Sequence, residues 1–207
     1  MGTLPCVTLR RALALLLLTA LIGAAVAEAA TIRGNNRDNK LTGTPRNDRI
    51  DGRGGDDQLF GLRGNDRLLG GTGRDRLSGQ SGRDTLRGGP DKDKLVGGVD
   101  ADVLDGDAAG DSLNGGSGDD VLKDTADGND ALGGGPGDDE LDGGVGNDRL
   151  DGGLGEDDLV GGDGNDTFRA RDGEQDTILC GPGEDTAVVD EEEDGVVDCE
   201  HVQMPGG

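Results

Sequence analysis

An aspartate recurs at nearly every ninth position of this chain, and an apolar residue stands two places after it. With the frame set at Gly34, nine-residue units run to residue 123, one ten-residue unit covers 124–133, and four more nine-residue units reach residue 169. Such a fixed period indicates a solenoid, in which each unit buries its apolar side chain only by stacking on its neighbours. The sixth-position column is Asn39, Asp48, Asp57, Asp66, Asp75, Asp84, Asp93, Asp102, Asp111, Asp120, Asp130, Asp139, Asp148, Asp157 and Asp166, and the apolar column runs from Leu41 to Phe168.

Each position of the repeat G-G-x-G-x-D-x-L-x has a physical reason. Glycine at the first, second and fourth positions permits positive φ and close backbone approach, so six residues can form a tight turn. The aspartate adds a carboxylate to the carbonyl oxygens of that turn, and a hard cation such as calcium prefers an all-oxygen environment. The last three residues form a short strand whose middle side chain points inward. We therefore expect an all-β fold with calcium bound in the turns.

The composition argues against a conventional apolar core. The formal net charge is -24, Trp and Tyr are absent, and Phe60 and Phe168 are the only aromatic residues. High net charge with few large apolar residues is typical of a disordered chain. The repeat and the composition agree if cations neutralise the carboxylates, which makes folding conditional on bound metal.

The first 27 residues have the organisation of a secretory signal peptide. Arg10 and Arg11 precede an apolar run at 12–22, and we expect cleavage after Ala27 or Ala29. The run is too short to span a bilayer comfortably, so no membrane span is expected after cleavage, and an uncleaved anchor is the alternative. We therefore predict a secreted, extracellular protein in which residues 28–33 form a short lead-in to the repeats.

Over residues 34–169 the chain resembles the RTX nonapeptide family, the haemolysin-type calcium-binding repeats. The resemblance implies a right-handed parallel β-roll with two nonapeptides per coil. It also implies that calcium lies between the turns of units n and n+2, held by sixth-position aspartates and turn carbonyls. The best-matching neighbours pair Asp120 with Asp139, Asp139 with Asp157, Asp148 with Asp166, Asp57 with Asp75, and Asp48 with Asp66.

The resemblance thus gives a set of candidate calcium ligands, concentrated where the repeat is complete. The units that begin at residues 88, 97 and 106 lack the fourth glycine, as do the first two units, and we expect weak or empty sites there. Six units match the repeat in full, at 70–77, 115–122, 134–141, 143–150, 152–159 and 161–168. The candidate ligands are Asp48, Asp57, Asp66, Asp75, Asp120, Asp139, Asp148, Asp157 and Asp166, with turn residues Gly116, Gly118, Gly135, Gly137, Gly144, Gly146, Gly153, Gly155, Gly162 and Gly164.

The register continues beyond Phe168 into a degenerate tail, which we expect to reach Val197. Cys180 and Cys199 are the only cysteines left once the leader is removed, and an oxidising compartment favours a disulfide between them. The register places both on one side of the roll, one strand spacing apart, close to the Cα separation that a disulfide requires. Residues 170–207 are therefore predicted to be degenerate repeats closed by a disulfide-stapled cap. This tail resembles that of exported actinobacterial members of the family.

Charge is distributed unevenly along the chain. Residues 33–94 contain 14 Lys and Arg against 10 Asp, whereas residues 95–207 contain 4 basic residues against 33 acidic ones. The basic N-terminal half could bind an anionic cell-wall polymer or extracellular polysaccharide, and the alternative is that these charges only solvate the rod. Nucleic acid is not expected as a partner, because stacking aromatic residues are absent and the whole chain is acidic.

The repeats leave little sequence for a catalytic site. The chain has one histidine, His201, and neither a His-Glu-x-x-His segment nor a plausible Ser/His/Asp set. We therefore expect no enzyme but a secreted calcium-binding repeat protein whose roll folds on binding several calcium ions, with a structural or interaction role. A cell-surface adhesin and a fragment related to RTX toxins are the alternatives.

Overall fold

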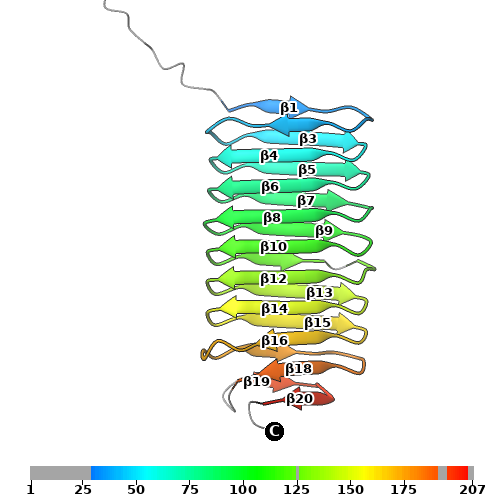
Figure 1. Cartoon of the computed structure of the whole chain (residues 1–207), viewed down its shortest axis with the longest axis vertical. Coiled ribbons are helices and arrows are strands. Elements are labelled where there is room, and N and C mark those ends of the chain that lie inside the picture. Colours follow the sequence, from blue (N-terminus) through cyan, green and yellow to red (C-terminus); the bar gives the residue numbers. More distant parts are fainter. Residues whose placement is uncertain (1–28, 125, 191–194, 205–207) are drawn as a thin grey trace, which may run out of the picture.

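The computed structural model describes residues 29–124, 126–190 and 195–204, so the predicted signal peptide at 1–27 lies outside it. The described chain winds into a solenoid of stacked strands, and successive strands alternate between two faces along the long axis (Figure 1). The two faces are two ten-stranded parallel sheets. The described residues contain no helix long and apolar enough to cross a membrane.

One sheet contains the odd-numbered strands and the other the even-numbered ones. The odd sheet has β1 (Thr31–Arg33), β3 (Arg49–Gly54), β5 (Arg67–Thr72), β7 (Thr85–Gly89), β9 (Val103–Asp107), β11 (Val121–Lys123), β13 (Glu140–Val145), β15 (Asp158–Asp163), β17 (Thr177–Leu179) and β19 (Gly195–Val197). The even sheet has β2 (Lys40–Thr42), β4 (Gln58–Arg63), β6 (Arg76–Ser81), β8 (Lys94–Val99), β10 (Ser112–Ser117), β12 (Ala131–Pro136), β14 (Arg149–Leu154), β16 (Thr167–Ala170), β18 (Thr186–Val189) and β20 (His201–Gln203).

The strand register confirms the predicted parallel β-roll with two units per coil. Ile50 of β3 faces Leu68 of β5, two units further on, and the apolar column keeps this pairing throughout. The ten-residue unit does not disturb it, because Leu113 faces Leu132 across that unit. The apolar column from Ile50 to Phe168 is buried and forms one continuous core between the sheets.

The strands are longer than the repeat pattern predicts. Most of the central strands span six residues rather than three, because pairing continues through the first three positions of the following unit. Arg53 and Gly71, at the second position of their units, are register partners in this way. The roll also includes β1, which lies within the segment 28–33 that we expected to be a lead-in, and β20, which lies beyond Val197.

The C-terminal end is closed by the predicted disulfide. Cys180 follows β17 and Cys199 follows β19, and these are the last two strands of the odd sheet. The two residues are bonded, with their Cα atoms 5.2 Å apart. The bridge therefore ties the last coil to the one before it, as the extended register predicts.

Candidate metal centre

The sixth-position aspartates form two continuous buried columns, one in each row of turns. In each column the backbone N–H of one aspartate donates a hydrogen bond to Oδ1 of the aspartate one coil further on. The N–H of Asp57 donates to Oδ1 of Asp75 over 2.7 Å, and that of Asp139 to Oδ1 of Asp157 over 2.9 Å. All five predicted pairs are neighbours of this kind: Asp48 and Asp66, Asp57 and Asp75, Asp120 and Asp139, Asp139 and Asp157, and Asp148 and Asp166.

The second oxygen of most of these carboxylates has no such partner. Asp48 is different, because the N–H of Thr44 donates a hydrogen bond to its Oδ2. A buried acceptor without a hydrogen bond retains its full desolvation penalty, so a column of them requires compensation. The unpartnered buried Oδ2 atoms belong to Asp57, Asp66, Asp75, Asp84, Asp93, Asp102, Asp111, Asp120, Asp124, Asp130, Asp139, Asp148, Asp166 and Asp185.

These oxygens lie close to carbonyl oxygens of the next coil. A Cβ atom placed on Gly134 would lie 2.1 Å from Oδ2 of Asp139 and 2.6 Å from the carbonyl oxygen of Gly152. The first-position glycine therefore leaves room for two oxygens from adjacent coils to approach one point. Calcium is bound by carboxylate and carbonyl oxygens, so the donor set of each turn fits this ion.

Burial gives the column a strong electrostatic character. Desolvation raises the pKa of most of these carboxyl groups from an ordinary value of 3.8, and the amide hydrogen bond to each one only partly offsets the rise. The pKa reaches about 6 for Asp66, Asp120 and Asp166, and about 7 for Asp75, Asp84, Asp93, Asp102, Asp139, Asp148 and Asp157. Without a counter-charge, an ionised column is unfavourable in the folded state.

A family model for the RTX calcium-binding nonapeptide repeat matches the chain in seven overlapping segments, at 33–68, 60–95, 69–104, 87–122, 124–159, 133–168 and 151–187. These segments cover most of the chain. It belongs to the RTX calcium-binding repeat family. A comparison with curated proteins returned no significant match. The match extends the repeats past residue 169 into the tail, as the register of the aspartate column predicts.

Several RTX turns keep their left-handed backbone conformation where glycine is missing, although Arg37, Arg46 and Asp91 at the fourth position do not. Arg53, Leu62 and Gln80 at the second position all have positive φ, as does Ala109 at the fourth. First-position glycines, by contrast, are not left-handed, so our expectation of positive φ there was wrong, and their role is close approach. All ten predicted turn residues have positive φ: Gly116, Gly118, Gly135, Gly137, Gly144, Gly146, Gly153, Gly155, Gly162 and Gly164.

A further ladder, which sequence reasoning missed, lies at the fifth position of the RTX unit. The N–H of Asn65 donates to Oδ1 of Asn47 over 2.9 Å, and that of Asn165 to Oδ1 of Asn147 over 2.8 Å. These exposed side chains thus connect adjacent turns by hydrogen bonds, beside the buried aspartate column. The sequence does show Asn or Asp repeatedly just before the sixth-position aspartate, but we predicted a role only for the sixth-position residue.

Proposed function

We propose that this RTX chain is an exported calcium-binding protein whose β-roll folds as several calcium ions bind outside the cell. The observation that carries the proposal is the column of buried Oδ2 atoms without a partner. Calcium would satisfy these oxygens and cancel their charge, so its binding free energy becomes folding free energy. The column aspartates from Asp48 to Asp166 and the turn carbonyls would hold the ions. Scarce calcium inside a cell would keep the chain unfolded for export.

We also propose a structural or interaction role rather than a catalytic one. The column aspartates are accounted for by the repeat, because each one accepts an amide hydrogen bond from the neighbouring coil. His201, the one histidine of the chain, is exposed at the C-terminal edge, with Nε2 3.7 Å from Oε2 of Glu184. The imidazole of His201 is thus on the surface, whereas the column aspartates are buried.

The test is a calcium titration of the mature chain followed by far-UV circular dichroism, with reversal by chelator. We expect disorder in chelator, a β-sheet spectrum in millimolar calcium, and little response to magnesium. Asp157→Asn removes a buried column charge and should shift the transition to higher calcium. Asp158→Asn is the matched control, because this neighbour is exposed on β15. A chain with the same β-sheet signal in chelator and in calcium would contradict the proposal.

A second candidate function, attachment to an anionic polysaccharide, is favoured by a basic patch on the even sheet. Arg76 of β6 and Lys94 of β8 are register partners, and Arg74 and Lys92 lie in the turns beside them. These four side chains line an open hollow of about 380 Å³ together with Asp56, Asp75, Asp93 and Ser112. Arg74 pairs with Asp56 over 3.3 Å, whereas the other three form no ion pair within the described residues. Stacked cations of this kind suit a polymer with regularly spaced negative charges.

Dextran sulfate serves as the model polymer, with retention measured in saturating calcium at increasing salt. Arg76→Ser with Lys94→Ser should weaken retention, and the effect should fade as salt screens the charges. The control is Arg149→Ser with Arg169→Ser, which makes the same charge change in the acidic half. Equal retention of the two double variants would exclude this patch as the binding surface.

A further inference from the structure

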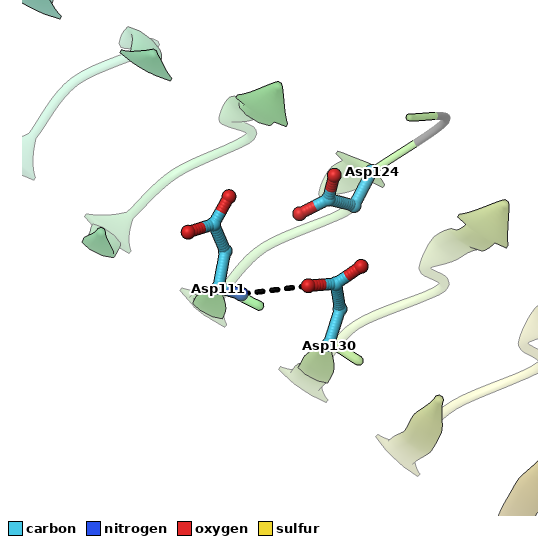
Figure 2. Close-up of side chains that lie close together, drawn as sticks. All are labelled: Asp111, Asp124 and Asp130. Carbon is cyan, nitrogen blue, oxygen red and sulfur yellow. Dashed lines mark hydrogen bonds between the residues drawn. The ribbon is translucent and has the colours of Figure 1, made fainter. Parts of the chain in front are cut away.

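The ten-residue unit contains an acidic residue where every other unit from 34 to 169 begins with glycine. Asp124 follows β11, and its N–H donates to the carbonyl oxygen of Asp142 over 2.8 Å, so it stays in the strand ladder. Its side chain turns inward and is completely buried. Figure 2 shows it facing Asp111 of the preceding coil and Asp130 of its own unit. One ligand oxygen from each of the three carboxyl groups lies within 4.8 Å of the others.

Asp124 changes the oxygens that surround the inner end of this turn. At Gly88 a Cβ atom would lie 2.4 Å from Oδ2 of Asp93 and 2.8 Å from the carbonyl oxygen of Gly106, as in most of the other turns of the array. At Gly106 the nearest atoms are instead Oδ2 of Asp124 at 2.1 Å and Oδ2 of Asp111 at 2.6 Å. A carboxylate oxygen thus stands where a neutral carbonyl oxygen stands elsewhere. The site therefore contains one more carboxyl group than its neighbours, and one more negative charge when Asp124 is ionised.

The oxygens of this cluster lack partners to an unusual degree. The Oδ1 atoms of Asp111 and Asp130 each accept a backbone N–H, from Asp93 over 2.7 Å and from Asp111 over 2.6 Å. Four other buried oxygens accept no hydrogen bond: Oδ2 of Asp111, Oδ2 of Asp130 and both oxygens of Asp124. None of the three carboxylates forms an ion pair within the part of the chain that the structure describes.

We infer that Asp111, Asp124 and Asp130 form a three-carboxylate calcium site between the turns at 106–111 and 124–130. One proton shared by two carboxyl groups would satisfy two of the four oxygens, whereas one cation contacts all three groups. Calcium binds oxygen at about 2.3–2.6 Å, so ligands up to about 5 Å apart can share one ion. The inference rests on the proposed function and deepens it, since Asp124 adds a ligand that the repeat does not supply. It also replaces our expectation of a weak site in the unit that begins at Gly106.

A third carboxylate should raise the affinity for calcium, because calcium affinity follows the number of charged ligands and the rigidity of the site. The added carboxylate would then offset any loss of calcium affinity from the missing fourth glycine of the unit at 106. This site need not bind calcium more weakly than the others of the array. Ala109 holds the left-handed conformation with φ of 78°, so the turn keeps its shape. We expect this ion to bind at least as tightly as those in the complete units at 134–168.

The test is equilibrium dialysis of the mature chain against radioactive calcium. Asp124→Asn removes one charge at nearly constant shape, and Asp124→Gly restores the residue found at this position in the other units. The control is Asp127→Asn, which removes one exposed carboxylate three residues away. At free calcium that just saturates the parent, both Asp124 variants should bind one ion fewer, because the affinity of that ion falls about tenfold or more. The control should match the parent.

Each outcome decides a different question. Asp124 variants that bind the same number of ions as Asp127→Asn, with the same affinity, would overturn the three-carboxylate site. That result would mean that a proton or a rearrangement of side chains gives the Asp124 oxygens a partner, while calcium still binds elsewhere. A parent that binds no calcium would instead overturn the proposed function. Circular dichroism in saturating calcium verifies that each variant is folded, and the glycine variant keeps the test open if the asparagine variant is not.

Discussion

The metal-free roll should be more stable in mild acid than at slightly alkaline pH. The pKa of a buried column carboxyl group such as Asp139 is raised by desolvation from 3.8 to about 7 in the folded chain. Between these two values the folded state binds more protons than the unfolded state. Stability therefore decreases as pH rises through this window, the reverse of the usual behaviour of paired carboxylates. Below about pH 3 both states are protonated and the dependence ends.

The size of the effect follows from the shift. A carboxyl group with pKa 3.8 unfolded and about 7 folded destabilises the folded state by about 2 to 3 kcal/mol as pH rises from 5 to 7.5. Seven aspartates with this shift together contribute on the order of 15–20 kcal/mol, more than the 5–15 kcal/mol by which a typical domain is stable. The seven are Asp75, Asp84, Asp93, Asp102, Asp139, Asp148 and Asp157.

The assay is far-UV circular dichroism of the mature chain, freed of metal by chelating resin, at a series of pH values. We expect β-sheet signal to increase as pH falls from about 8 to about 5, and saturating calcium to give the full signal at pH 8. A further run in high salt separates this effect from general charge repulsion, which salt screens. A metal-free chain with equal or greater β-sheet signal at pH 8 than at pH 5 would refute the reasoning.

Three further predictions concern calcium-saturated protein. Leu104→Ala removes a fully buried core side chain and should lower the free energy of unfolding by about 2–5 kcal/mol, measured by heat or urea. Val103→Ala, at a side chain that is 43 % exposed, should lower it by less than about 1 kcal/mol. Equal losses would contradict the single inward column. Gly89→Ala should destabilise the roll far more than Gly173→Ala. Both glycines have positive φ, but only at Gly89 would a Cβ atom lie 1.9 Å from a facing carbonyl oxygen. Comparable melting temperatures of the two variants would contradict this. Cys199→Ser removes a disulfide that closes a loop over 19 residues and should lower the free energy of unfolding by about 3 kcal/mol. The loss should be seen as faster proteolysis of the C-terminal coil. Reductant should speed proteolysis of the parent equally and leave the variant unchanged.

The column of aspartates and apolar residues predicted most of the architecture because the period fixes the register. If every unit has the same length, the residue at position eight must stack on the residue two units away, and Ile50 does face Leu68. The same counting carried through the ten-residue unit at 124–133 and a second one at 170–179, and it placed Cys180 beside Cys199, with Cα atoms 5.2 Å apart. A solenoid has few long-range choices, so local spacing determines contacts that in a globular protein would depend on the whole chain.

Features that depend on side-chain direction were not predictable in this way. Strand length was underestimated because parallel pairing needs only matched backbone, and residues such as Arg53 supply it despite their positive φ. The role of Asp124 was missed because a substituted first-position glycine was counted only for its effect on phase. Its inward direction continues the alternation of β11, because Leu122 in the strand and Asp124 just after it are both buried. The spacing of the repeat alone does not show that the side chain of a first-position residue lies beside the sixth-position aspartates.

The paired columns would make a roll of this kind depend on calcium, whatever its length. Each unit buries one apolar side chain, which stabilises it by about 1.5–3 kcal/mol. Most units also bury an aspartate. Ionising one such as Asp139, whose pKa is raised from 3.8 to about 7, costs about 4 kcal/mol at a pH above the raised value. Adding units adds both contributions equally, so length does not change the sign of their sum. The ion must therefore be supplied coil by coil, and a coil that lacks glycines, such as the one containing Asp111, can compensate with a further carboxylate that strengthens the attraction for the ion.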